Sequence, residues 1–65
     1  MIRLNGDSIS GCEGITLEEL VNKQNFNKSR IAVEINGAII PKKDYEATQI
    51  QENDVVEVVS FVGGG

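Results

Sequence analysis

The chain has 65 residues, of which 40% are hydrophobic and none is Trp, so it has room for one small aliphatic core and not for a large substrate cavity. Six basic and ten acidic side chains give a net charge of -4, which opposes the phosphate neutralisation that nucleic-acid binding needs. One cysteine and no histidine exclude, within this chain, a disulfide, a Cys/His zinc site and every catalytic triad that contains histidine.

The sequence carries no sign of export or of membrane insertion. It reaches a turn at Asn5 and Gly6 before an apolar signal region could develop, and no stretch approaches the roughly 20 apolar residues of a membrane span. We therefore expect a cytoplasmic protein with no membrane partner, no nucleic-acid partner, no metal and no cofactor. The acidic charge suits a basic partner protein.

The first predicted element is a β-hairpin. Ile2 and Leu4 alternate with polar neighbours, which is the pattern of a half-buried strand. Asn5 and Gly6 supply the positive φ angles of a tight turn, so residues 8–12 should return antiparallel with Ile9 facing inward.

A helix should follow, beginning at Thr16. Thr16 and Glu19 have the spacing of a capping box, in which each side chain satisfies the other residue's backbone amide. One stripe of the helix should pack on the sheet, formed by Leu17, Leu20 and Val21. The helix should end near residues 24–25, where Asn25 can take the left-handed cap conformation, and Phe26 should fold back onto the core.

A second hairpin is predicted at residues 31–40. Alternation gives a strand at 31–35, an Asn-Gly turn follows at 36–37, and the apolar run 38–40 ends at Pro41, which favours a sheet edge. Residues 42–51 read as a connection with a helical turn near 44–46, and Ile50 should enter the core. Asn53 suits a left-handed position in the turn before the last strand.

The last strand should have two different faces. Placing Glu57 outward sends Val56 and Val58 into the core and leaves Val59 and Phe61 on the opposite, open face, together with Val55. The elements together predict an α+β fold with a mixed sheet of four to five strands, one helix across one face, and the other face open to water.

The chain then finishes on Gly63, Gly64 and Gly65. Glycine has no Cβ, so such a stalk could thread a channel too narrow for other residues and present the carboxylate of Gly65. Terminal glycines are also often inert or remnants of cloning, and the residues alone leave that alternative open. We expect a domain at residues 1–62 and a flexible tail at 63–65.

These features resemble the ubiquitin-like β-grasp sulfur carriers, most closely the ThiS family of thiamine-biosynthesis sulfur carriers. The resemblance covers nearly the whole chain, in the segments 1–6, 16–20, 35–37, 40–42, Tyr45, 53–54 and 62–65. One departure is Asn53, where these carriers often have Gly; Asn tolerates the same backbone region.

The resemblance implies a protein that is a co-substrate of enzymes and not itself an enzyme. The Gly65 carboxylate would be adenylated by a ThiF-type enzyme related to ubiquitin-activating enzymes and become a thiocarboxylate. Its sulfur, from a donor such as a cysteine desulfurase, would pass to thiazole synthase. Gly64 would be the channel residue and Gly63 a hinge. The expected docking residues are Phe61, Val59 and Val62.

Two alternatives stay open: a carrier for molybdopterin, cysteine or tRNA thiolation, and a non-catalytic ubiquitin-like interaction domain. The remaining candidate residues, apart from two lysines, are expected to have structural roles. Cys12 is expected to be a small buried residue in a strand, Asp54 a turn former, and Tyr45 a partly buried residue with its hydroxyl in water. Lys42 and Lys43 could mark either a recognition point or a solvated loop.

Overall fold

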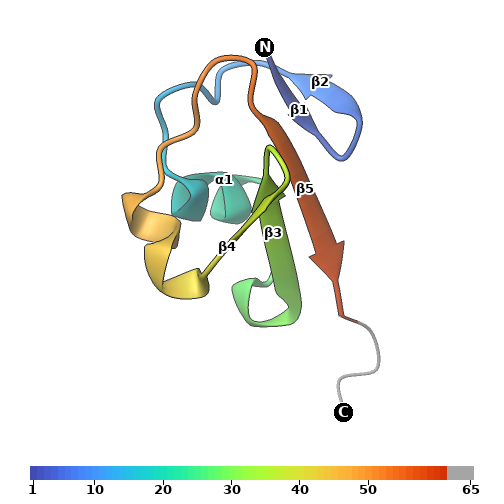
Figure 1. Ribbon diagram of the computed structural model, residues 1–65, viewed down its shortest axis with the longest axis vertical. Coiled ribbons are helices and arrows are strands. Elements are labelled where there is room, and N and C mark those ends of the chain that lie inside the picture. Colours follow the sequence, from blue (N-terminus) through green and yellow to red (C-terminus); the bar gives the residue numbers. More distant parts are fainter. Residues whose placement is uncertain (62–65) are drawn as a thin grey trace.

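The computed structural model describes residues 1–61, which form a five-stranded sheet crossed by one α-helix (Figure 1). The strands are β1 (Ile2–Leu4), β2 (Asp7–Ile9), β3 (Ile31–Ile35), β4 (Ala38–Ile40) and β5 (Val55–Ser60), in the sheet order β2-β1-β5-β3-β4. The central strand β5 runs parallel to β1 and antiparallel to β3. The predicted mixed sheet is therefore confirmed.

Both hairpins turn at an Asn-Gly pair. Asn5 and Asn36 have φ angles of 51° and 53°, and the glycines after them are also positive. Asn25, after the helix, and Asn53, before β5, have φ angles of 62° and 70°, as expected. Within residues 1–61 every non-glycine residue with positive φ is an asparagine, because Asn tolerates the left-handed region better than other residues with a Cβ.

The helix α1 (Leu17–Lys23) begins as predicted. Thr16 is its N-cap, and the Glu19 amide donates to Thr16 Oγ1 at 3.1 Å while the Thr16 amide donates to Glu19 Oε1 at 2.9 Å. This reciprocal pair satisfies amides that lack partners within the helix. The stripe of Leu17, Leu20 and Val21 is buried.

The core lies between α1 and one face of the sheet. The helix stripe meets the inward residues of the strands, namely Ile2, Leu4, Ile31, Val33, Ile35, Val56 and Val58. Ile50 is fully buried in the same cluster, and Ile9 and Phe26 pack against its edge, as predicted. No helix within residues 1–61 combines the length and apolar character that a bilayer crossing requires.

The prediction for Tyr45 is wrong. Its side chain is wholly buried at 0% exposure, and its hydroxyl has no hydrogen-bond partner among the described residues. The 3-10 helix η2 (Lys42–Ala47), which carries Tyr45, packs against α1. Lys28, from the 3-10 helix η1 (Lys28–Arg30), places its Nζ 5.2 Å from the ring centroid. Lys28 is held there by an ion pair of 2.7 Å with Glu18.

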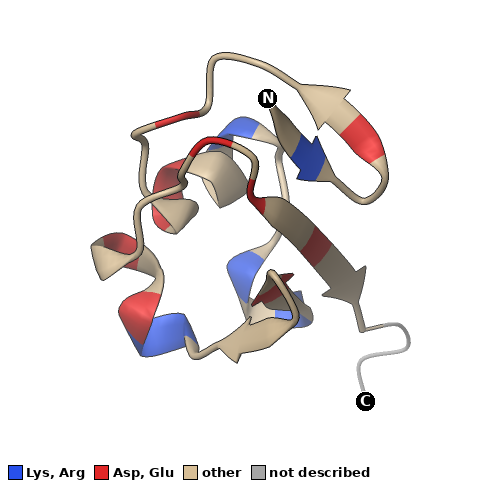
Figure 2. Cartoon of the chain, turned by 45° about the horizontal axis from the view of Figure 1, so that its top comes forward, with Lys and Arg blue, Asp and Glu red and all other residues tan. Residues whose placement is uncertain are grey.

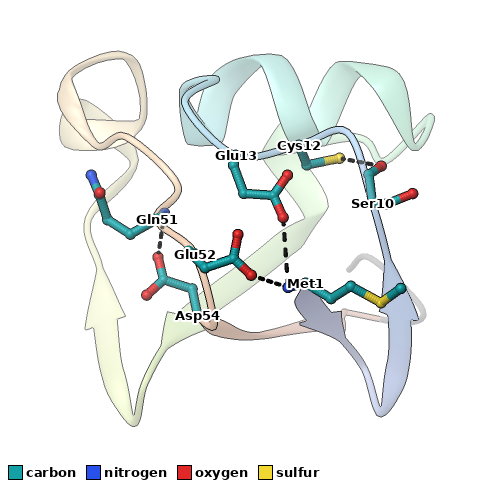
Figure 3. A network of polar contacts seen from close by, with 7 residues as sticks. All are labelled: Met1, Ser10, Cys12, Glu13, Gln51, Glu52 and Asp54. Carbon is teal, nitrogen blue, oxygen red and sulfur yellow. Dashed lines mark hydrogen bonds and ion pairs between the residues drawn. The ribbon is translucent and has the colours of Figure 1, made fainter.

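The prediction for Cys12 is correct for burial and wrong for its setting. The thiol is 2% exposed, but β2 ends at Ile9 and Cys12 lies in the loop that follows. Gly11 has a φ of 80°, which an extended strand cannot accommodate, so the chain leaves the sheet before Cys12. The sulfur lies 3.9 Å from the Ser10 carbonyl oxygen (Figure 3).

Candidate functional site

The last strand is secured along its length by side chains from both hairpin turns. The Val58 amide donates to Asn5 Oδ1 at 2.8 Å, and the Val55 amide donates to Asn36 Oδ1 at 2.9 Å. Beyond the strand, the Phe61 amide donates to the Arg30 carbonyl at 2.7 Å. The backbone is thus fixed as far as Phe61, the last described residue.

The two faces of β5 are assigned correctly from the sequence. Val56 and Val58 are buried in the core, whereas Val55, Val59 and Phe61 are 42%, 59% and 54% exposed. Because the helix covers only the inner face, these three side chains lie on the open face. Their exposure is what a docking surface requires, although the docking role itself stays a prediction.

Ile39 is 71% exposed, although it was not predicted to belong to the open face. It lies on the edge strand β4, opposite Glu34 of β3. A signal was present, because Ile40 had to face inward beside Val33, and alternation then sends Ile39 outward. We define the apolar patch as the four exposed residues of the open face: Ile39, Val55, Val59 and Phe61.

The tail residues lie outside the described part of the chain. Val62, Gly63, Gly64 and Gly65 were expected to form the docking edge and the reactive tail, and the division into a domain at 1–62 and a tail at 63–65 falls there too. These expectations stay predictions. Within the described residues, the relevant geometry is a strand that borders the apolar patch and is fixed as far as Phe61.

Asp54 has a structural role at the start of this strand (Figure 3). Its carboxylate accepts from the Gln51 amide at 2.8 Å and from the Asn36 side chain at 2.9 Å, so it forms the turn as expected. Figure 3 also shows the amino group of Met1 between Glu13, at 3.7 Å, and Glu52. The Glu52 hydrogen bond is the main cause that raises the pKa of this amino group.

Lys42 does not behave as a free recognition residue. Its Nζ donates to the Ile31 carbonyl at 2.8 Å, which ties η2 to β3, although both Lys42 and Lys43 are exposed residues. Among residues 1–61 no three His, Cys, Asp or Glu side chains are grouped so that they could hold a metal ion.

Comparison with known proteins decides the family. The sequence profile of the ThiS family matches residues 2–65. The chain belongs to the ThiS family. It is 33% identical over 66 residues to the "Sulfur carrier protein ThiS" of Bacillus subtilis, with 100% of both chains covered.

Two further relatives carry other names, and one of them is a much longer protein. An "Uncharacterized protein ycf40" of Porphyra purpurea is 39% identical over 64 residues, which cover 98% of this chain and 90% of that protein. A "Thiazole synthase" of Magnetococcus marinus is 42% identical over 64 residues, which are 98% of this chain but only 20% of that protein.

The fold of this ThiS-family chain is also that of a solved relative. It matches the crystal structure of the thiamine biosynthesis protein (ThiS) from Geobacter metallireducens with a TM-score of 0.79 and 28% identity, covering 98% of this chain and 97% of that one. The predicted β-grasp architecture is therefore confirmed.

Proposed function

We propose that this chain is a sulfur carrier of thiamine biosynthesis and that the Gly65 carboxylate is the group that carries the sulfur. Membership of the ThiS family supports the pathway, and the family profile extends through the terminal glycines. The observation that carries the proposal is the position of β5. This strand borders the apolar patch and is held by hydrogen bonds as far as Phe61, and the terminal glycines follow shortly after it in the sequence.

The chemistry explains why a carrier would need partner enzymes. A carboxylate is a poor electrophile, because its charge repels nucleophiles and oxide is a poor leaving group. Attack of the Gly65 carboxylate on the α-phosphorus of ATP releases pyrophosphate and forms an acyl adenylate. The persulfide of the sulfur donor then displaces AMP, which leaves with one oxygen of the former carboxylate. A thiol must next cleave the resulting acyl disulfide, which releases the Gly65 thiocarboxylate and leaves a disulfide on the donor. This chain contributes an unhindered acyl carbon, which Gly64 and Gly63 would let into a narrow active site.

Three partners follow from this proposal. A ThiF-type enzyme would adenylate the tail, a donor such as a cysteine desulfurase would supply sulfur, and thiazole synthase would consume it. The last partner has separate support, because a protein named thiazole synthase contains a segment that matches 98% of this chain. Joining two sequences in one polypeptide is consistent with their acting together.

Loading of the tail tests the proposal directly. The full chain is incubated with a ThiF-type enzyme, ATP, a cysteine desulfurase, cysteine and a thiol reductant, and its intact mass is followed for exchange of one oxygen for sulfur on the C-terminal peptide. We expect exchange in the wild type. We expect none in a variant that lacks Gly64 and Gly65, or in one with a single residue added after Gly65.

The control is the fold of these variants. Both should keep the thermal unfolding midpoint of the wild type, since the residues that hold β5 end at Phe61. Sulfur loading that persists in the shortened chain would overturn the proposal and would favour a ubiquitin-like interaction domain with an incidental tail. Sulfur delivered to molybdopterin, cysteine or tRNA precursors, and not to thiazole, would reassign the pathway.

A further inference from the structure

Two carboxylates occupy the centre of the open face. Glu34 of β3 and Glu57 of β5 are direct partners in the antiparallel ladder. Such partners point to the same side of the sheet with Cβ atoms about 4.5–5.5 Å apart, and like charges in this arrangement destabilise a sheet. The repulsion between Glu34 and Glu57 therefore lowers the stability of the isolated chain.

The described residues do not neutralise this pair. Ion pairs within residues 1–61 join the Met1 amino group to Glu13 and Glu52, and Lys28 to Glu18. The nearest cation in the ladder is Arg3, the β1 partner of Val55, and it forms no ion pair in this part of the chain. Figure 2 marks the acidic positions of β3 and β5 in red on neighbouring strands.

Apolar side chains surround the two carboxylates. Ile39 lies opposite Glu34 on β4, and Val59 lies opposite Ala32 in the next row. Val55 precedes Glu57 by two residues on the same face of β5. A protein that covered the apolar patch would therefore remove water from around both carboxylates, and an unpaired buried charge is costly.

We propose that Glu34 and Glu57 together receive one cationic side chain, an arginine or a lysine, from the enzyme that adenylates the tail. The inference rests on the proposed function and adds the chemistry of the contact. An arginine suits it better, because a planar guanidinium can donate to two carboxylates at once. Charge complementarity selects this occupant: a second copy of the chain would bring four carboxylates together across the same face.

Binding of charge-neutral variants tests the inference. The affinity of a purified ThiF-type enzyme is measured by titration calorimetry for the wild-type full chain and for Glu34→Gln/Glu57→Gln. The matched control is Asp7→Asn/Glu46→Gln, which removes the same charge at exposed positions of β2 and η2. We expect Kd to rise at least about tenfold for the Glu34/Glu57 variant and to change less than about twofold for the control.

Two further readouts separate a docking role from a structural one. The affinity of Glu34→Gln/Glu57→Gln should depend less on salt than that of the wild type, because its charge contact is gone. Its thermal unfolding midpoint should be equal to or higher than that of the wild type, because the like-charge repulsion is also gone. A clearly lower midpoint would mean that the pair stabilises the free chain, which contradicts the inference.

The outcomes distinguish the inference from the function. Normal sulfur loading together with wild-type affinity of Glu34→Gln/Glu57→Gln would remove the cation site and leave the carrier function standing. Equal weakening of the test and control variants would also remove it, since net charge alone would then explain binding. Absence of wild-type loading in the mass assay would refute the proposed function itself, whatever the affinities.

Discussion

The side-chain amide of Asn36 donates a hydrogen bond of 2.9 Å to Oδ1 of Asp54, which joins the β3–β4 turn to the turn that precedes β5. The same Asn36 side chain accepts from the Val55 amide through Oδ1. One residue thus forms its own hairpin with a positive φ and also fixes the start of the strand that leads to the glycines. Asn36 therefore meets two separate requirements. Its backbone adopts the positive φ of the turn, and its side chain accepts a hydrogen bond from the central strand.

Substitution of Asn36 by glycine separates these two requirements. Glycine keeps the positive φ but removes both side-chain hydrogen bonds, one of which goes to a carboxylate, so we expect a loss of about 2 kcal/mol in the free energy of unfolding. The control is Asn53→Gly, where φ is also positive and no side-chain hydrogen bond is present among the described residues. Urea unfolding should place Asn53→Gly within about 0.5 kcal/mol of the wild type; equal losses would assign the effect to the backbone alone.

Thr16→Ala should weaken the start of α1. The substitution removes the acceptor for the Glu19 amide, and loss of an N-cap hydroxyl costs about 1 kcal/mol. Chemical denaturation with circular dichroism measures the change. Ser8→Ala on the exposed edge strand β2 is the control and should leave stability unchanged. If Thr16→Ala is as stable as the wild type, then helix packing on the sheet, and not the capping box, sets where α1 begins.

Tyr45→Phe should fold at least as stably as the wild type. The Tyr45 hydroxyl is buried without a partner in the described structure, and an unsatisfied buried hydroxyl costs about 1–3 kcal/mol, part of which the substitution recovers. Urea unfolding at neutral pH measures this. A loss of stability would show that the hydroxyl has a favourable contact in solution.

Tyr45 also predicts a pH dependence. Burial raises the pKa of the Tyr45 hydroxyl above its ordinary value of 10.0, and the charge of Lys28 only partly opposes this. The folded state therefore holds the phenolic proton more tightly than the unfolded state, so this contribution is complete below about pH 10 and is lost as pH rises through the folded pKa. Between pH 8 and pH 11, the free energy of unfolding should fall more steeply for the wild type than for Tyr45→Phe. If the free energy of unfolding falls equally with pH in both proteins, the raised pKa of Tyr45 is contradicted.

Phe61→Asp should affect docking more than folding. The ring is 54% exposed, so we expect its replacement to change the unfolding free energy by less than about 1 kcal/mol while weakening binding to a ThiF-type enzyme. Val58→Asp, three residues earlier on the core face of β5, is the contrasting variant and should lose on the order of 3 kcal/mol or fail to fold. If both variants unfold alike, Phe61 belongs to the core and the docking prediction for it is wrong.

Local chemistry was enough to predict most of the elements. The period of two at 31–35, the Asn-Gly pairs at 5–6 and 36–37, and the capping box at Thr16 each act over a few residues, and the structure confirms each of them. The two faces of β5 also followed from alternation, because one outward glutamate fixes every other side chain of a strand.

One error has a local cause, and the other errors fall where contacts between distant segments decide. Cys12 leaves the predicted strand because a backbone angle at Gly11 ends the hairpin early. Tyr45 is buried where η2 packs against α1, with Lys28 over its ring. The same reason explains why Glu34 and Glu57 could not be paired in advance, whereas alternation within the run 38–40 already indicated that Ile39 faces outward. Only the strand order and register set which side chains are neighbours across the sheet.

The sequence by itself determined the fold class, the helix start, the turns and the glycines at the end of the chain, because these depend on short-range backbone preferences and on side-chain periodicity. The tertiary structure decided what lies around Phe61, the last described residue before those glycines in the sequence. It lets the Phe61 amide donate a hydrogen bond to the Arg30 carbonyl, places Ile39 on the edge strand, and sets two glutamates side by side on the open face. These relationships arise from pairing between strands that are far apart in the chain, which no local pattern encodes.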